Sequence, residues 1–198
     1  MNYPEYAKIG NKKYKINTDF RIAIKCNEIA EDNTINDYKR ALGIICLLYG
    51  KEVIGDRENY QRLLEIAKKY LACGKEVSTN NEKADMDFIE DEEYIKSSFK
   101  YDYKYDPYKM EYLHWYEFYN DLCNLSNSEL GDCCVLNRVR NLRNFDLRDI
   151  KDSKERAKIK KAKEQVALKK YQKKKVANDK QLESAIKLYE ELGLIERK

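Results

Sequence analysis

Apolar residues recur along most of this chain at intervals of three and four, the spacing that predicts amphipathic helices. The exception is the stretch 7–16, AKIGNKKYKI, where Gly10-Asn11 separates two short runs and predicts a β-hairpin with a tight turn. The stretch ALGIICLLY is apolar on all sides, which indicates the most buried helix. Helices are predicted over about 17–32, 35–49, 56–73, 90–101, 107–122 and 126–143.

Polar and turn-forming residues mark the ends of these predicted helices. Ser, Thr, Asp and Asn before a helix accept hydrogen bonds from its first free N–H groups, and Gly often ends a helix because it tolerates left-handed backbone. The predicted caps are Thr18 or Asp19, Asp56, Asp106 followed by Pro107, and Ser126 with Glu129; the predicted ends are Gly50 and Gly74.

The stretch DPYKMEYLHWYEFYNDL, residues 106–122, is dense in aromatic residues and holds the only histidine and the only tryptophan of the chain. Its aromatic residues at i, i+4, i+7 and i+11 predict one face of a helix; they are Tyr108, Tyr112, Trp115 and Tyr119. A packed aromatic face is typical of a core, which gives the predicted core residues His114, Trp115 and Phe118. Tyrosine is also enriched in protein contacts, so the candidate protein-contact residues here are Tyr108, Tyr112, Tyr116 and Tyr119.

The character of the sequence changes at about residue 146. The segment 151–175 contains 12 Lys or Arg and 3 Asp or Glu, has good helix propensity and carries only a thin apolar stripe. It predicts a basic helical arm that is exposed to solvent. Beyond it, an amphipathic helix is predicted, and its apolar stripe adds the candidate contact residues Leu182, Ile186, Tyr189 and Leu192.

We therefore predict a mostly α protein with two parts. Residues 1–145 form a helical domain with a small N-terminal β-hairpin, and residues 146–198 form the basic arm and the terminal helix. Composition agrees with this fold class, because the 198 residues include only 7 Gly and 2 Pro, whereas all-β folds use both freely in turns.

Charge changes the picture of the surface. Charged residues make up 37% of the chain and hydrophobic residues 42%, a balance that fits a folded and very soluble protein. The basic segment 151–175 contrasts with an acidic cluster at 82–94, EKADMDFIEDEEY. This separation predicts pairing within the chain or with a partner of the opposite pattern.

The residues that usually carry catalysis or bind metals do not form a recognisable motif. None of the 6 cysteines forms a CxxC pair, and a single histidine cannot complete a zinc spacing. No GxSxG, Walker, dinucleotide or kinase signature occurs. We therefore predict no enzymatic activity, no cofactor, and no catalytic or metal-binding residue.

The N-terminal residues and the hydropathy pattern bear on location. The stretch MNYPEYAKIG is too polar for a signal peptide, and no apolar run approaches the length of a membrane span. A cytoplasmic protein with reduced thiols and no membrane contact is the expectation.

Nucleic-acid binding is an alternative interpretation of the segment 151–175. Its lysines could neutralise several phosphates. Only Tyr171 is interleaved with them, however, and no helix-turn-helix, zinc-finger or RNA-platform motif is present. A solvated helix, or one that pairs with an acidic protein surface, is the favoured interpretation.

Several segments together resemble a known family. Asp87-Phe88 with Glu93-Tyr94-Ile95, Leu113-His114-Trp115 with Phe118, and the later RVRNLRNFDLRDIKDSKERAKIKKAKEQVALKK occur in that order. They are similar to small proteins from the tail gene modules of siphophages and prophages of Gram-positive bacteria. Tyr116 departs from the pattern, in which another Trp often follows His-Trp.

The resemblance implies a non-enzymatic tail assembly protein in the cytoplasm of the bacterial host. Its expected role is that of a chaperone for the tape-measure protein, bound before the tail tube polymerises. Further expected partners are a second tail assembly protein and other copies of the same chain, on which the terminal helix would dock. A structural tail or head–tail joining protein is the alternative.

Overall fold

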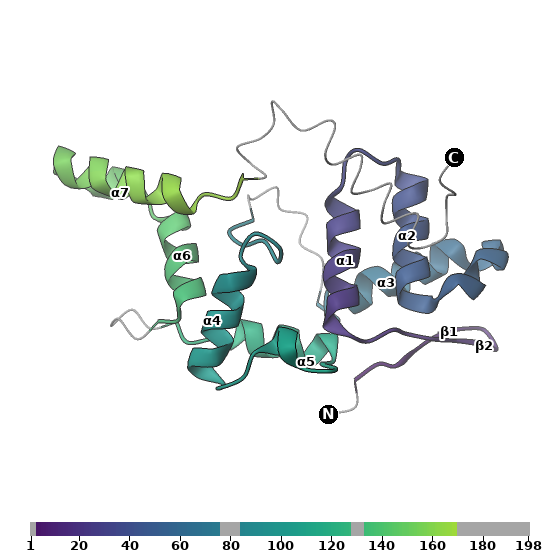
Figure 1. The fold of residues 1–198 in the computed structure, drawn as a ribbon. Coiled ribbons are helices and arrows are strands. Elements are labelled where there is room, and N and C mark those ends of the chain that lie inside the picture. The colour runs from purple at the N-terminus through teal and green to yellow at the C-terminus, as the bar shows by residue number, and fades with distance from the viewer. Residues whose placement is uncertain (1–2, 76–83, 128–132, 170–198) are drawn as a thin grey trace, which may run out of the picture. The chain divides into compact units, whose positions relative to one another are not determined.

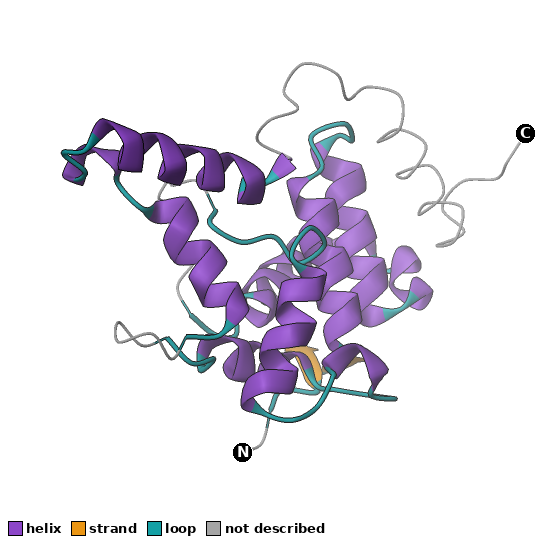
Figure 2. Ribbon diagram, turned by 60° about the vertical axis from the view of Figure 1, so that its left-hand side comes forward, coloured by secondary structure: helices purple, strands orange, loops and turns teal. Residues whose placement is uncertain are grey.

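The computed structural model describes residues 3–75, 84–127 and 133–169. These residues are mostly helical, and two short strands near the N-terminus are the only sheet among them (Figures 1 and 2). The predicted fold class, mostly α with an N-terminal hairpin, is thereby confirmed. The predicted terminal helix with Leu182, Ile186, Tyr189 and Leu192 lies outside the described residues.

The described residues group into two compact units. One contains those within Met1–Thr79 and Tyr112–Tyr119, and the other contains those within Asn80–Glu111 and Asn120–Val176. We call them the first and the second unit. The predicted division of the chain between residues 145 and 146 stays a prediction.

The first unit begins with the predicted hairpin. Strands β1, Tyr6–Ile9, and β2, Lys12–Lys15, pair in an antiparallel manner, and Gly10 takes a positive φ of 55° in the turn between them. Glycine adopts this left-handed backbone without a steric penalty, which suits it to a tight hairpin turn. Ala7 and Ile9 are buried beneath the hairpin.

Two helices of the first unit follow the sequence prediction closely. Helix α1, Phe20–Glu31, begins after Asp19, whose carboxylate accepts a hydrogen bond from the Arg21 N–H at 2.9 Å. Helix α2, Asp37–Tyr49, ends at Gly50, where φ is 90°. Both predicted boundaries, the cap at Asp19 and the stop at Gly50, are confirmed.

The third helix starts later than predicted. Helix α3 spans Tyr60–Leu71, and the 3-10 turns Lys51–Gly55 and Arg57–Asn59 occupy the preceding chain. Asp56 does not cap it, because its carboxylate accepts hydrogen bonds from Lys12 at 2.9 Å and from the Tyr14 hydroxyl. The Asp56 side chain, which the sequence predicts as the cap of this helix, therefore binds the hairpin instead.

The predicted helix over 107–122 is broken into two pieces. Pro107–Lys109 form a 3-10 turn, and helix α5 begins only at Trp115 and ends at Cys123. Asp106 does cap the turn, as predicted, by accepting from the Tyr108 N–H at 3.1 Å. The chain between the two pieces is not helical.

Backbone pairing within the first unit explains the break. The Phe20 N–H donates to the Leu113 carbonyl at 3.0 Å, and the Trp115 N–H donates to the Thr18 carbonyl at 2.8 Å. These bonds form an isolated antiparallel bridge centred on the pair Asp19 and His114. Pairing with the start of α1 therefore replaces the helical hydrogen bonds that the spacing predicted.

The second unit is built around helices α4, Glu92–Asp102, and α6, Val135–Asn144. Its core contains Ile95, Phe99 and Leu136, each fully buried. The buried Ser98 hydroxyl accepts from the Leu136 N–H at 3.0 Å, so α4 supplies a cap for the first turn of α6. The buried polar side chain is satisfied by this bond.

The sixth predicted helix begins later than Ser126. Ser126 is not helical, and both its N–H and its hydroxyl donate to the Asp102 carboxylate, at 2.7 and 2.9 Å. The observed start at Val135 follows Cys134, and Glu129 lies outside the described residues. The predicted capping box at Ser126 is therefore wrong as a helix start.

The described part of the basic arm forms helix α7, Ser153–Val166, preceded by the 3-10 turn Leu147–Asp149. Asp152 caps α7 by accepting from the Glu155 N–H at 2.8 Å. None of the residues of α7 is buried, whereas Leu168 just after it is. The predicted exposure is thus confirmed for α7, whereas Ile150 and Leu168 on either side of it are buried.

Candidate protein-contact site

Trp115 lies at the centre of the first unit. Its side chain is 1% exposed, and its indole N–H donates to the Leu71 carbonyl at the end of α3, at 3.2 Å. Phe118, one turn later on α5, is fully buried and stacks on Phe20 of α1, with ring centroids 4.4 Å apart. These contacts fix α5 against α1 and α3 within this unit.

His114 is buried beside Trp115 and acts at the start of α5. Its Nδ1 accepts a hydrogen bond from the Tyr116 N–H at 3.0 Å, which satisfies one free donor of the first helical turn. The imidazole stacks on Tyr3 with ring centroids 4.8 Å apart and meets Tyr70 edge-on. A neutral imidazole has an acceptor nitrogen, and burial lowers the pKa of His114, which favours that neutral form.

The four tyrosines predicted as contact residues do not share one helical face. Tyr108 lies in the 3-10 turn of the second unit and is half-buried. Tyr112 lies in the non-helical stretch before α5, is 52% exposed, and shares a hydrogen bond of 2.6 Å with the Thr18 hydroxyl. Tyr116 and Tyr119 lie three residues apart on α5 and are half-buried.

Three of these tyrosines therefore remain together in the first unit. Tyr116 packs against Tyr70, and Tyr119 packs against Trp115 while the Lys75 ammonium lies 5.0 Å from its ring centre. A rigid core thus holds aromatic rings that keep part of their surface in solvent. Such rings can supply apolar contact area to another protein at a low cost in side-chain entropy.

Sequence reasoning missed two further exposed tyrosines of the first unit, Tyr6 and Tyr38, which are 41% and 62% exposed. The alternation of strand β1 could have identified Tyr6, because its neighbours Ala7 and Ile9 lie on the opposite, buried face. Tyr38 follows the cap of α2, where the sequence pattern alone leaves its direction open.

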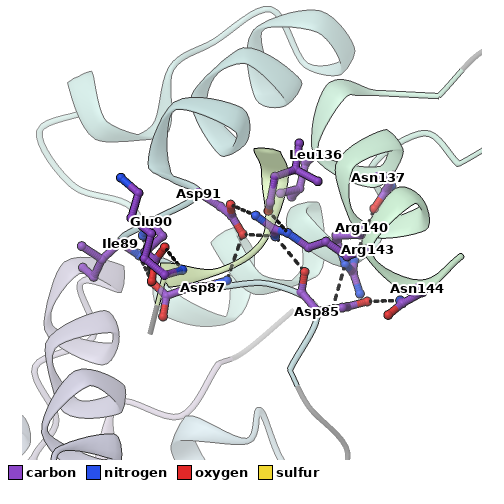
Figure 3. A network of polar contacts seen from close by, with 12 residues as sticks. Asp85, Asp87, Ile89, Glu90, Asp91, Leu136, Asn137, Arg140, Arg143 and Asn144 are labelled. Carbon is purple, nitrogen blue, oxygen red and sulfur yellow. Dashed lines mark hydrogen bonds and ion pairs between the residues drawn. The ribbon is translucent and has the colours of Figure 1, made fainter. Parts of the chain in front are cut away.

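The second unit contains a polar network that connects the acidic stretch to α6 (Figure 3). The Arg143 guanidinium binds the Asp91 carboxylate through two hydrogen bonds of 2.7 Å, and the side chains are 10% and 1% exposed. The same guanidinium donates to the carbonyls of Asp85 at 2.8 Å and Val166 at 2.7 Å. Arginine is seldom buried, so the low exposure of Arg143 depends on these four hydrogen bonds.

The acidic stretch itself is folded by this network. The Asp87 carboxylate accepts from the N–H groups of Ile89 and Glu90, both at 2.8 Å, while the Asp87 N–H donates to Asp91 at 3.0 Å. The Asp85 carboxylate accepts from the Asn144 amide at 2.9 Å, as Figure 3 shows. Several of the acidic residues thus have structural partners inside one unit.

Lysines of α7 form the described part of the basic segment. Lys154, Lys158 and Lys161 are exposed and follow the i, i+4, i+7 spacing of one helical face. Within the residues that the structure describes, none of the three forms an ion pair. Residues 170–175 of the basic segment lie outside that part of the chain.

In the ranges 3–75, 84–127 and 133–169, no three His, Cys, Asp or Glu side chains are grouped as metal ligands would be. The helices found there all fall short of the length and hydrophobicity that a bilayer crossing requires.

Most of the segments behind the family resemblance have structural roles in these units. Asp87 and Asp91 fold the acidic stretch, Leu113, Trp115 and Phe118 are buried, and the RVRNLRN segment supplies Arg143. Searches of curated proteins and of solved structures found no match to this chain. The model of the family described as Bacteriophage Gp15 protein matches residues 3–168, which include nearly all of the described residues of both units. The chain therefore belongs to the bacteriophage Gp15 protein family.

Proposed function

We propose that this phage protein is a non-enzymatic tail assembly chaperone that binds the tape-measure protein before the tail tube polymerises around it. The observation that carries the proposal is the family match over residues 3–168. The segments DFIEDEEYI and LHWYEF, which resemble tail-module proteins, lie within the matched region. In this role the chain binds a client and changes no covalent bond.

The physical requirements of the role favour the tyrosines of the first unit as contacts. A long helical client exposes apolar helix faces until its own tube covers them, and a binder must offer apolar area without aggregating. Tyr112, Tyr116 and Tyr119 offer ring surface while the buried Trp115 and Phe118 hold the adjoining backbone. A charged fraction of 37% keeps such a surface soluble.

Co-expression with the tape-measure protein of the same phage tests the contact. We expect the client to stay soluble and to co-purify with the wild-type chain. Tyr112→Ala should lower the apparent affinity about ten-fold, the equivalent of roughly 1.4 kcal/mol. Tyr101→Ala is the matched control, because Tyr101 is 56% exposed but lies in the second unit. Equal recovery of the client with both variants would refute the assignment of Tyr112.

Mass spectrometry of purified virions tests the role itself. A chaperone leaves the tape measure before the particle is finished, so we expect the chain in lysates and not in virions. Stoichiometric amounts in finished particles would show a structural tail or head–tail joining protein instead.

A further inference from the structure

The two faces of the β-hairpin differ sharply in chemistry. Residues on the inner face are buried, as at Ala7 and Ile9, or engaged with Asp56, as at Tyr14. The outer face, which we call the lysine face, consists of Tyr6, Lys8, Lys13 and Lys15, and all four are exposed. The hairpin is therefore anchored on one side and offers a positively charged surface on the other.

The lysine face brings like charges together. The Ile16 N–H donates across the ladder to the Glu5 carbonyl at 2.8 Å, which identifies Glu5 and Ile16 as a hydrogen-bonded pair. Pairs alternate along an antiparallel ladder, so Lys8 and Lys13, which are direct partners, form a non-hydrogen-bonded pair. Side chains approach most closely at such pairs, and directly opposed like charges destabilise a sheet.

The hairpin relieves this repulsion only in part. The Lys13 ammonium lies 3.7 Å from the centre of the Tyr6 ring, a cation–π contact. Among the described residues, Lys8, Lys13 and Lys15 have no carboxylate in ion-pair distance, whereas Lys12 on the inner face pairs with Asp56 at 2.9 Å. The positive charge of the lysine face thus lacks a counterpart in the described part of the chain.

The same alternation leaves backbone groups of β2 pointing away from β1. The outward amides are those of Lys13 and Lys15, and the next outward amide, of Asn17, donates to the Leu48 carbonyl of α2 at 2.7 Å. The Asn17 amide therefore has a hydrogen-bond acceptor, whereas the amides of Lys13 and Lys15 have none among the residues that the structure describes. An open edge of this kind can accept an added strand.

We propose that the lysine face and the open edge of β2 form a docking surface for an acidic, extended segment of a partner protein. An added strand would bond to the backbone of Lys13 and Lys15 and place every second side chain beside the lysines. Carboxylates at those alternate positions would neutralise the repulsion described above.

The charge of the lysine face and the open edge of β2 together favour one kind of partner over the others. A second copy of this chain paired through the same edge would bring lysine against lysine, so the surface rejects self-association through β2. Nucleic acid can satisfy the ammonium groups through phosphate but cannot continue a β-ladder. Only an acidic peptide satisfies both the charges and the open backbone. This inference does not depend on the proposed function.

A synthetic peptide with alternating Glu and Val is the probe, measured by fluorescence anisotropy and by amide shifts of the ¹⁵N-labelled full chain. We expect binding with the largest shifts at Lys13 and Lys15. Lys13→Gln/Lys15→Gln should weaken it about ten-fold or more. Lys25→Gln/Lys39→Gln is the matched control, because it removes the same charge from exposed positions of α1 and α2 and should change the affinity less than about two-fold.

Four results would overturn the proposal. One is the absence of binding to the wild-type chain, and another is equal weakening by the two double variants. The third is equal affinity for a peptide whose backbone N–H groups on one edge are methylated, since simple charge attraction would then suffice. A single-stranded DNA oligonucleotide that bound the same lysines more tightly than the peptide at about 150 mM salt would assign the surface to nucleic acid.

Discussion

Replacing Arg143 by Met should destabilise the second unit strongly. The substitution removes both hydrogen bonds to Asp91 and the bonds to the Asp85 and Val166 carbonyls. Asp91, which is 1% exposed, would lose the cation beside it. Breaking a buried ion pair by removing one partner costs about 3–5 kcal/mol, and the length of Met limits any additional cavity.

The chain offers a matched control in the same unit. Arg148 also pairs with Asp146, at 2.6 Å, but the two side chains are 91% and 41% exposed. Exposed pairs contribute about 0–1 kcal/mol because water competes for both charges. The same substitution, Arg148→Met, should therefore leave the urea midpoint of unfolding nearly unchanged.

A third variant separates charge from packing. Asp91→Leu/Arg143→Met removes both charges, and apolar replacement of a buried pair is often far less costly than loss of one partner. We expect the double variant to be more stable than Arg143→Met alone, although the Asp87 N–H loses its acceptor.

Hydrogen exchange of α4 and α6 peptides, with far-UV circular dichroism in urea, measures these changes unit by unit. Arg143→Met should speed exchange in both helices, and Arg148→Met should not. Equal urea midpoints for the two single variants would refute the reasoning that burial decides the value of the pair.

Three further predictions concern the first unit and the thiols. Trp115→Ala should lower the free energy of unfolding by about 3–5 kcal/mol because a large buried aromatic side chain is lost. Circular dichroism in urea measures the change. A loss no greater than that of Tyr38→Ala, at an exposed position, would contradict the placement of Trp115 in the core. Burial lowers the pKa of His114 against the opposing effect of Glu117 and Glu5, so the unfolded chain binds the additional proton first and stability should fall as the pH drops below about 6.5. His114→Gln should lose less stability between about pH 7.5 and 5.5, and an equal loss in both proteins would rule out His114 as the source. Burial raises the pKa of the Cys26 thiol. A thiol reagent at neutral pH should therefore label the exposed Cys123 in the native protein and Cys26 only after urea is added. Mass spectrometry locates the label, and labelling of Cys26 in the native protein would contradict its burial.

Local patterns were sufficient where local contacts decide the structure. The hairpin follows from alternation around Gly10, and α1 and α2 follow from their apolar stripes with Asp19 and Gly50 at their boundaries. In each case the capping or turn residue acts on backbone a few positions away. Such interactions are visible in sequence because spacing alone places the partners together.

Long-range partners account for the differences. Asp56 and Ser126 have the residue types of helix caps, but their side chains bind Lys12 and Asp102, which lie far away in sequence. The aromatic spacing of 107–122 is helical, yet the strand-like pairing of His114 with Asp19 interrupts it. The periodicity within a segment does not show whether a distant segment will hydrogen-bond to its backbone or side chains.

The candidate contact residues also show where local spacing is sufficient and where tertiary structure decides. Spacing correctly brought Tyr116 and Tyr119 onto one helix but joined them to Tyr108, which belongs to the other unit. Arginine is seldom buried, and only the tertiary structure reveals that Arg143 is paired with Asp91. Buried ion pairs of this kind join segments whose relation cannot be inferred from one sequence.

The positions of the shared segments limit what family membership says about partners. Asp91, Trp115 and Phe118 are buried, so another protein cannot contact them while their units remain folded. They fix how the acidic stretch folds and how α5 packs within its unit. The partner contacts proposed above must therefore come from exposed residues, such as Tyr112 before α5 and Lys13 on the hairpin. The residues that define the fold of each unit are thus separate from those that another protein could touch.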